Sequence, residues 1–495
     1  TNTAGNFSVN GNTTFAKGFT MTAGTFTVAA NKTLTLTDGT LNLASGCTYS
    51  DSSNSGLTFN GGDLTVNNSA TVAAAITVSN DVTITCSSAL TISSNFNVGA
   101  NTIIKAGTGQ LNGGTITLDN ADSLIQVTGA STIANDLAFS ADSNASKGLD
   151  FNAAVTVSGD ITMTASPIID FAATTLTYSG AAVNLGAKTL TLTGTGSFTN
   201  TNNLVLDNVA SLLKLAGCTV AKVSQTAVAN ASKGIDVATT ASTITTFNSG
   251  SSSRLALGAN LTITTAFSVG ANTVILSGTS QLDGGAITLD NADSLIQATG
   301  ACTIANDLAF SADSNASKGL DFNAAVTVSG DITMTASPIV DFGANTLTYS
   351  GAAVNLGAKT LTLTGTGNFT NTNNLVLDNA DSLLKLAGCT VAKVSQTGAA
   401  NANKGLDVAT TASTVTTFTS SGNSRVALGA NLTVTNAFNV GANTMILSGT
   451  SQLDGGAITL NNADSLIQAT GACTIANDLA FSADSNASKG LDFDA

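Results

Sequence analysis

The sequence predicts an all-β protein folded as a single elongated parallel β-solenoid (β-helix), with about 21 residues and three short strands in each coil. Two observations carry this prediction. The segment 139–168 returns unchanged at 310–339, a shift of 171 positions, and apolar residues alternate with Thr or Asn inside each repeat. Repeated strands that bury only one face are typical of a solenoid, because each coil hides its apolar residues by stacking on its neighbours.

Shorter markers divide this long repeat into two related halves. NASKGLDF and its variants begin at positions 144, 230, 315, 401 and 486, so successive starts differ by 86, 85, 86 and 85. The predicted repeat units are 1–153, which diverges at its N-terminal end, 154–324 and 325–495. We expect one continuous solenoid whose unit boundaries are phases of the repeat and not linkers.

Period-two segments provide the predicted strands. They include TLTLT at 33–37, LTFNGGDLTV at 57–66 and AVTVSGDITM at 154–163, with Gly, Asn and Asp between them. This alternation indicates strands with two different faces, and the β-branched residues suit a pleated surface. About twelve triplets per half-repeat predict four coils, hence roughly 23 coils in the chain. An array of β-sandwiches is the alternative, but its turn signals come about 8 to 12 residues apart, whereas these triplets recur about every seven.

The composition excludes several classes of function. Only 9% of the residues are charged and the net charge is -14, so no basic patch for nucleic acid or anionic lipid can be drawn. No run of eighteen apolar residues occurs, which predicts no membrane span. His and Glu are absent, and with them the commonest general base and nitrogen metal ligand, so we expect no cofactor.

The six cysteines are too few for a disulfide framework in a chain of 495 residues. Cys302 and Cys473 are repeat-equivalents, yet Ser131 holds the same position one unit earlier, and a disulfide or metal ligand would not tolerate Ser. Cys86 stands where later units have Leu257 and Leu428. We therefore expect buried free thiols that pack as small apolar groups.

The phrases LTLTGTG, GGAITL and the VGANT-like markers give the chain a family resemblance. It resembles the β-strand repeats of filamentous haemagglutinin-type adhesins, autotransporter passengers and other large bacterial surface proteins, over nearly its whole length. The resemblance implies the solenoid fold and a location outside the cell, at the cell surface. It implies no particular activity, because such phrases describe coils and not a catalytic signature.

The first candidate site is a loop with the sequence KGLD or KGID. Its two readings are a binding loop displayed repeatedly along the solenoid, and a structural corner where the Lys and Asp lie near each other in a weak exposed ion pair. The residues are Lys147, Asp150, Lys233, Asp236, Lys318, Asp321, Lys404, Asp407, Lys489 and Asp492.

The second candidate is the LDNADSL segment, whose carboxylates are weak candidates for a calcium site because calcium prefers oxygen clusters. Asn461 replaces the first Asp in the third unit, and Asp and Asn in turns need no metal. The candidate residues are Asp119, Asp122, Asp290, Asp293 and Asp464.

Function is predicted only by class. The first hypothesis is a structural subunit of an extracellular filament, sheath or stalk that associates end to end with itself. The sequence stops eighteen positions short of three full units, so either a partner or more of the same chain would supply the next coil. The second is an adhesin or autotransporter-type passenger with cell-surface or carbohydrate contacts. The third is a polysaccharide-acting β-helix enzyme, which we do not expect, because a catalytic cluster should break the repeat.

Overall fold

The computed structural model describes residues 2–52 and 54–494 and confirms the all-β class. Strands make up 52% of the structure, no helix forms in the described residues, and the strands build a parallel β-solenoid of about 22 turns, close to the number predicted. The chain divides into two compact units, Thr1–Phe247 and Asn248–Ala495. In the described part of the chain no helix could cross a membrane.

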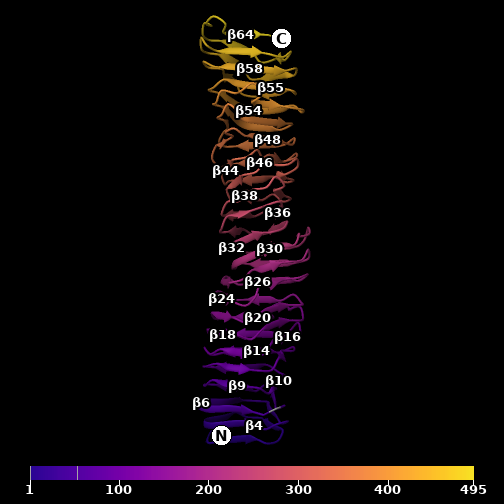
Figure 1. Ribbon diagram of the computed structural model, residues 1–495, viewed down its shortest axis with the longest axis vertical. Helices are drawn as coiled ribbons and strands as arrows, with labels where there is room; N and C mark the ends of the chain where they lie inside the picture. Colours follow the sequence, from indigo (N-terminus) through magenta and orange to yellow (C-terminus); the bar gives the residue numbers. More distant parts are fainter. Residues whose placement is uncertain (1, 53, 495) are drawn as a thin grey trace. The chain divides into compact units, whose positions relative to one another are not determined.

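Many coils contribute one strand to each of three parallel sheets, here called sheets 1, 2 and 3. In unit 1, β14 (Thr102–Ala106), β15 (Leu111–Gly113) and β16 (Ile116–Leu118) form one such coil. Each pairs in parallel with its counterpart in the next coil, β17 (Leu124–Val127), β18 (Ser131–Ile133) and β19 (Leu137–Phe139). The same stacking repeats along both units, as the successive ribbons in Figure 1 show.

Sheet 1 is the most regular of the three. In unit 1 its other strands are β1 (Asn2–Ala4), β2 (Phe7–Val9), β4 (Phe19–Val28), β6 (Thr40–Asp51), β8 (Asp63–Val66), β11 (Val82–Cys86), β20 (Gly148–Phe151), β23 (Ile168–Asp170), β26 (Thr189–Thr193), β29 (Leu212–Ala216) and β31 (Gly234–Val237). In unit 2 they are β33 (Ser253–Leu257), β36 (Thr273–Gly278), β39 (Leu295–Ala298), β42 (Gly319–Phe322), β45 (Ile339–Asp341), β48 (Thr360–Thr364), β51 (Leu383–Ala387), β53 (Gly405–Val408), β55 (Ser424–Leu428), β58 (Thr444–Gly449), β61 (Leu466–Ala469) and β64 (Gly490–Phe493).

Most strands of sheet 2 have two to four residues. In unit 1 they also include β9 (Ala70–Val72), β12 (Leu90–Ile92), β21 (Val155–Val157), β24 (Thr175–Tyr178), β25 (Val183–Asn184), β27 (Ser197–Asn200), β28 (Leu204–Leu206) and β30 (Thr219–Gln225). In unit 2 they include β34 (Leu261–Ile263), β37 (Gln281–Gly284), β40 (Thr303–Ile304), β43 (Val326–Val328), β46 (Thr346–Tyr349), β47 (Val354–Asn355), β49 (Asn368–Asn371), β50 (Leu375–Leu377), β52 (Thr390–Gln396), β54 (Ser413–Ser420), β56 (Leu432–Val434), β59 (Gln452–Gly455) and β62 (Thr474–Ile475).

Sheet 3 is interrupted. In unit 1 it comprises β3 (Thr13–Phe15), β5 (Thr33–Leu36), β7 (Gly56–Phe59) and β10 (Ala75–Val78), and then β13 (Phe96–Asn97), β16, β19 and β22 (Ile161–Met163). In unit 2 it comprises β35 (Phe267–Ser268), β38 (Ile287–Leu289), β41 (Leu308–Phe310) and β44 (Ile332–Met334), and then β57 (Phe438–Asn439), β60 (Ile458–Leu460) and β63 (Leu479–Phe481).

The core is a set of apolar columns that run from coil to coil. One column in sheet 1 of unit 1 contains side chains that are at most 1% exposed and lie opposite one another in register: Ile103, Ile125, Leu149, Ile169, Leu192, Leu215 and Val237. Burying one such side chain is worth about 1.5–3 kcal/mol. The alternate residues point outward, so the period-two sequence places Thr, Lys and Asp on the outer face of sheet 1.

Candidate functional site

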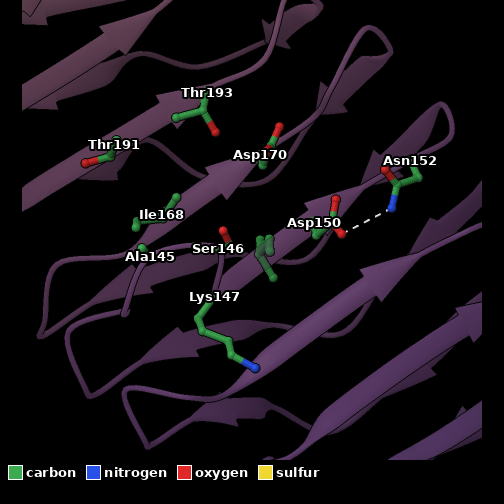
Figure 2. A pocket seen from close by; sticks show the side chains of 10 residues that line it. Ala145, Ser146, Lys147, Asp150, Asn152, Ile168, Asp170, Thr191 and Thr193 are labelled. Carbon is green, nitrogen blue, oxygen red and sulfur yellow. Dashed lines mark hydrogen bonds between the residues drawn. The ribbon is translucent and has the colours of Figure 1, made fainter. Parts of the chain in front are cut away.

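The candidate site is a groove on the outer face of sheet 1, and it occurs once in each unit. In unit 1 its volume is about 580 Å³, and residues from the turn 145–147 and from β20, β23 and β26 line it. Figure 2 shows the carboxylate of Asp150 on one strand, Asp170 on the next, and Thr191 and Thr193 on a third. The groove therefore combines residues from three successive coils.

Unequal loop lengths create this groove. Segment 140–147 connects β19 to β20, whereas the shorter segment 164–167 connects β22 to β23 in the following coil. The longer loop is fixed to the shorter one, because the Ser143 amide donates to the Ser166 carbonyl at 3.0 Å and the Ser166 amide donates to Asp142 Oδ1 at 2.7 Å. It ends in a turn closed by the Lys147 amide and the Asn144 carbonyl.

Two residues of this turn have positive φ angles. Ser146 has a φ of 60°, a left-handed conformation that is uncommon for a residue with a side chain. Gly148 has a φ of 95°, and a Cβ there would collide with the Ile168 carbonyl oxygen of the next coil. Only glycine allows the two coils to approach this closely after the turn.

Neutral groups hold the first carboxylate of the groove. Gln126 Nε2 donates to Asp150 Oδ2 at 2.6 Å from the preceding coil, and Asn152 Nδ2 donates to the same oxygen at 3.1 Å. In Figure 2 the Lys147 side chain points in a different direction from the Asp150 carboxylate, whose drawn hydrogen bond goes to Asn152. The charge of Asp150 is thus satisfied by amide hydrogen bonds from the protein and not by the lysine of its own KGLD sequence.

The second carboxylate lies in register with the first. Asp170 in β23 stands opposite Asp150 in β20, on strands about 4.8 Å apart, and Asp170 Oδ1 accepts the Ala172 amide at 2.8 Å. Thr193 in β26 follows in the same column. Like charges directly opposite each other destabilise a sheet, so this column has an unfavourable electrostatic energy.

The second half of the repeat has the opposite arrangement. There Lys214 stands opposite Asp236 in unit 1, and Lys385 stands opposite Asp407 in unit 2. Opposite charges in register are favourable on a sheet. Sheet 1 therefore carries a pair of opposite charges at Lys214–Asp236 and a pair of like charges at Asp150–Asp170 in the groove.

Unit 2 reproduces the groove one full repeat later in the sequence. It has a volume of about 510 Å³ and is lined by the turn 316–318 and by β42, β45 and β48. Asp321 again lies opposite Asp341, and Gln297 Nε2 donates to Asp321 Oδ2 at 2.7 Å. Ser317 has a φ of 61°. The acidic pair, its amide donor and the left-handed serine thus occur together in both units.

The Lys and Asp residues of the KGLD and KGID loops are all half-buried. Each lysine donates its backbone amide to the carbonyl of the Asn three positions earlier, and a strand of sheet 1 that contains the Asp follows. These lysines are Lys147, Lys233, Lys318, Lys404 and Lys489. Asp492 in β64 accepts Gln468 Nε2 at 3.2 Å.

The calcium candidates are all exposed, and each accepts a hydrogen bond from the protein. Asp119 and Asp290 accept the amides of Gly99 and Gly270, and Asn461 does the same for Gly441 at 3.0 Å. Asp122, Asp293 and Asp464 each accept the side-chain amide of an Asn on the next coil at 2.8 Å. No group of three or more acidic or Cys side chains that could hold a metal ion occurs in residues 2–52 and 54–494.

The cysteines are free thiols, and all but the half-buried Cys473 are buried. Burial raises the pKa of the Cys218, Cys302 and Cys389 thiols to about 11. Burial also raises the pKa of Cys86, and the neighbouring Lys105 opposes part of that rise.

Lys105 is a residue that the sequence interpretation missed. It is fully buried in β14, and its Nζ donates to the carbonyls of Ala106 at 3.0 Å and Gly107 at 3.1 Å. The repeat-equivalent residues are Leu276 and Leu447, both buried. Comparison of the repeat units at this position would have identified a lysine at a core position.

Asp170 and the two threonines also have no signal in the sequence of any single loop. The signal for them is the combination of coil lengths that brings residues 150, 170 and 193 into one column.

No family model matches the chain, and neither the curated proteins nor the solved structures contain a significant match to it. The class of protein that the structure establishes is the parallel β-solenoid.

Proposed function

We propose that this chain is a structural subunit of an extracellular filament, sheath or stalk that extends by stacking one β-solenoid coil on another. The observation that carries the proposal is the apolar face that each coil presents to the next. Phe310, Leu320 and Phe322 are at most 1% exposed, because the following coil covers them. Their equivalents one repeat later, Phe481, Leu491 and Phe493, lie in the last coil that the structure describes and are 54%, 38% and 58% exposed.

A second copy of this chain is the occupant we propose for the uncovered face. A coil stacked there would bury the three side chains and also pair the strand edges of β63 and β64, which gives an open head-to-tail assembly. The first coil offers suitable partners, because Phe7 and Phe15 are half-buried and Phe7 packs on Phe19 with ring centroids 4.8 Å apart. The resemblance to bacterial surface proteins supports an extracellular location for such an assembly.

Light scattering of the purified chain over a range of concentrations tests this proposal. We expect the wild-type mass to grow with concentration, and the Phe481→Asp/Phe493→Asp variant to remain a monomer because it places charges in the interface. Val209→Asp is the matched control, since Val209 is 52% exposed in a loop of unit 1, and this variant should assemble like the wild type. A wild-type chain that stays monomeric at every concentration contradicts the proposal, as does assembly of the double variant.

The second candidate is an adhesin-type passenger that displays binding sites. The observation that favours it is the groove, which appears with the same residues in both units. Two sites on one chain can bind a polymeric ligand with higher avidity than either site alone. Both candidates assign the chain no catalytic activity, and release of cleavage products from a panel of polysaccharides would contradict that.

A further inference from the structure

We propose that each of the two grooves is a binding site for a glycan that carries free amino groups. The proposal rests on the acidic pairs Asp150–Asp170 and Asp321–Asp341, on the groove above each pair, and on the compensated pairs elsewhere on the same sheet. It goes beyond the structural function and does not depend on end-to-end assembly.

The charge of the ligand follows from the partners of the carboxylates. The protein gives Asp150 two side-chain amides and gives Asp170 one backbone amide, and all of these donors are neutral. Two carboxylates on strands about 4.8 Å apart repel each other, and a ligand ammonium group between them would remove that repulsion and donate charge-assisted hydrogen bonds to both.

The outer face of sheet 1 does not need an acidic pair for folding. At Lys214–Asp236 the outer face of sheet 1 carries a favourable pair in register. In the groove, the chain retains an unfavourable pair in both units. A cost in stability that recurs at a cavity is typical of a binding site, where the ligand supplies the missing partner.

The remaining lining residues suit a sugar. Thr191 and Thr193 alternate along β26, so both hydroxyl groups face the groove and can exchange hydrogen bonds with sugar hydroxyls. Ile168 and Ala145 add an apolar patch against which the C–H face of a sugar ring can pack. A volume of about 580 Å³ lies in the ordinary range for small-molecule sites.

Electrostatics argue against an anionic glycan. The chain has a net charge of -14, and the lysine in the lining of the unit 1 groove, Lys147, is outnumbered there by two carboxylates. An anionic ligand would meet repulsion on approach and inside the groove, whereas a cationic one is attracted in both places.

Calorimetric titration of the full chain with a glucosamine oligomer tests the proposal. The N-acetylglucosamine oligomer of the same length is the matched ligand, because it differs only in the acetyl groups that remove the positive charges. We expect two sites per chain for the glucosamine oligomer, and an affinity for the acetylated oligomer that is at least roughly tenfold weaker. Binding of the glucosamine oligomer should be lost as the pH rises through the titration of its amines.

Variants assign the binding to the grooves. Asp150→Asn/Asp170→Asn should leave one site per chain, and adding Asp321→Asn/Asp341→Asn should leave none. These residues are half-buried on an outer face, so circular dichroism should show an unchanged fold.

The control is Asp38→Asn, which removes an exposed carboxylate outside the grooves and should keep two sites. Unchanged binding in the fourfold variant, or equal binding of the acetylated oligomer, overturns the proposal. Neither result bears on end-to-end assembly, which light scattering measures separately.

Discussion

Replacing Lys105 with Leu should stabilise the coil that contains β14. Lys105 is fully buried, and the acceptors of its ammonium group are two backbone carbonyls. Leu276 and Leu447 occupy the equivalent positions in unit 2 and are also fully buried, so the fold accepts a leucine there without a change in the coil. The substitution removes a buried positive charge and leaves an apolar side chain in its place.

The magnitude follows from two opposing contributions. Replacing buried ionic groups with apolar ones of similar volume is neutral to stabilising by about 1–4 kcal/mol. Because the acceptors of the Lys105 ammonium group are neutral carbonyls, we take the upper part of that range, about 3–4 kcal/mol. Loss of the two hydrogen bonds offsets about 1 kcal/mol each, which leaves a net local stabilisation of about 1–2 kcal/mol.

Native-state hydrogen exchange is the appropriate assay, because a repeat protein of this length need not unfold in one step. The Leu variant should slow exchange of the amides in β11, β14 and β17 by roughly 5- to 30-fold. The equivalent strands β33, β36 and β39 serve as an internal reference and should not change. Unchanged or faster exchange in β14 would mean that burial of the Lys105 charge does not destabilise the coil.

A double-mutant cycle with Cys86→Leu extends this experiment, because it measures the coupling of the two side chains. Since Lys105 partly opposes the burial-induced rise in the Cys86 pKa, the two residues interact, and the effects of their replacement should deviate from additivity by about 0.5 kcal/mol or more. Strict additivity would indicate that they do not interact.

Two further predictions concern a turn and the buried thiols. Gly148→Ala should destabilise its coil by about 2–4 kcal/mol, because the new Cβ would meet the backbone of the next coil. Gly186→Ala, at a φ of 55° with open space around the position, should destabilise the protein by only about 1 kcal/mol. Thermal unfolding compares the two variants, and equal losses of stability would contradict the steric argument. Burial raises the thiol pKa of Cys218, Cys302 and Cys389 from 9.0 to about 11, so these thiols ionise at a lower pH in the unfolded chain than in the folded one. The free energy of unfolding should therefore be constant below pH 9 and fall as the pH rises toward 11, by at most about 3 kcal/mol per thiol. Iodoacetamide labelling at pH 9 should be slow in the folded chain, and labelling as fast as in denaturant would show that the thiols are accessible.

The solenoid could be predicted from sequence because its physical causes are local. The alternation in LTFNGGDLTV at 57–66 sets two short strands with an intervening turn, and the structure places β7 and β8 there. Repetition then requires that every coil find a similar neighbour, so the stacking follows from the pattern without knowledge of any single contact.

The groove could not be predicted, because it depends on differences between coils. Asp150 and Asp170 lie opposite each other because the coil that leads from β20 to β23 is shorter than the coil that leads from β17 to β20, and the sequence does not reveal the register that results. Lys105 was hidden for a different reason. Ile103 and Ile104 are both apolar, so alternation allows either phase, and one phase places Lys105 outside.

Electron cryomicroscopy of the purified chain shows whether this β-solenoid extends by adding coils. We expect filaments in which the first coil of one copy continues the last coil of another, at the same spacing of about 4.8 Å that separates coils within a chain. Single, separate particles at high protein concentration, with Phe481 and Phe493 in contact with solvent, would contradict it.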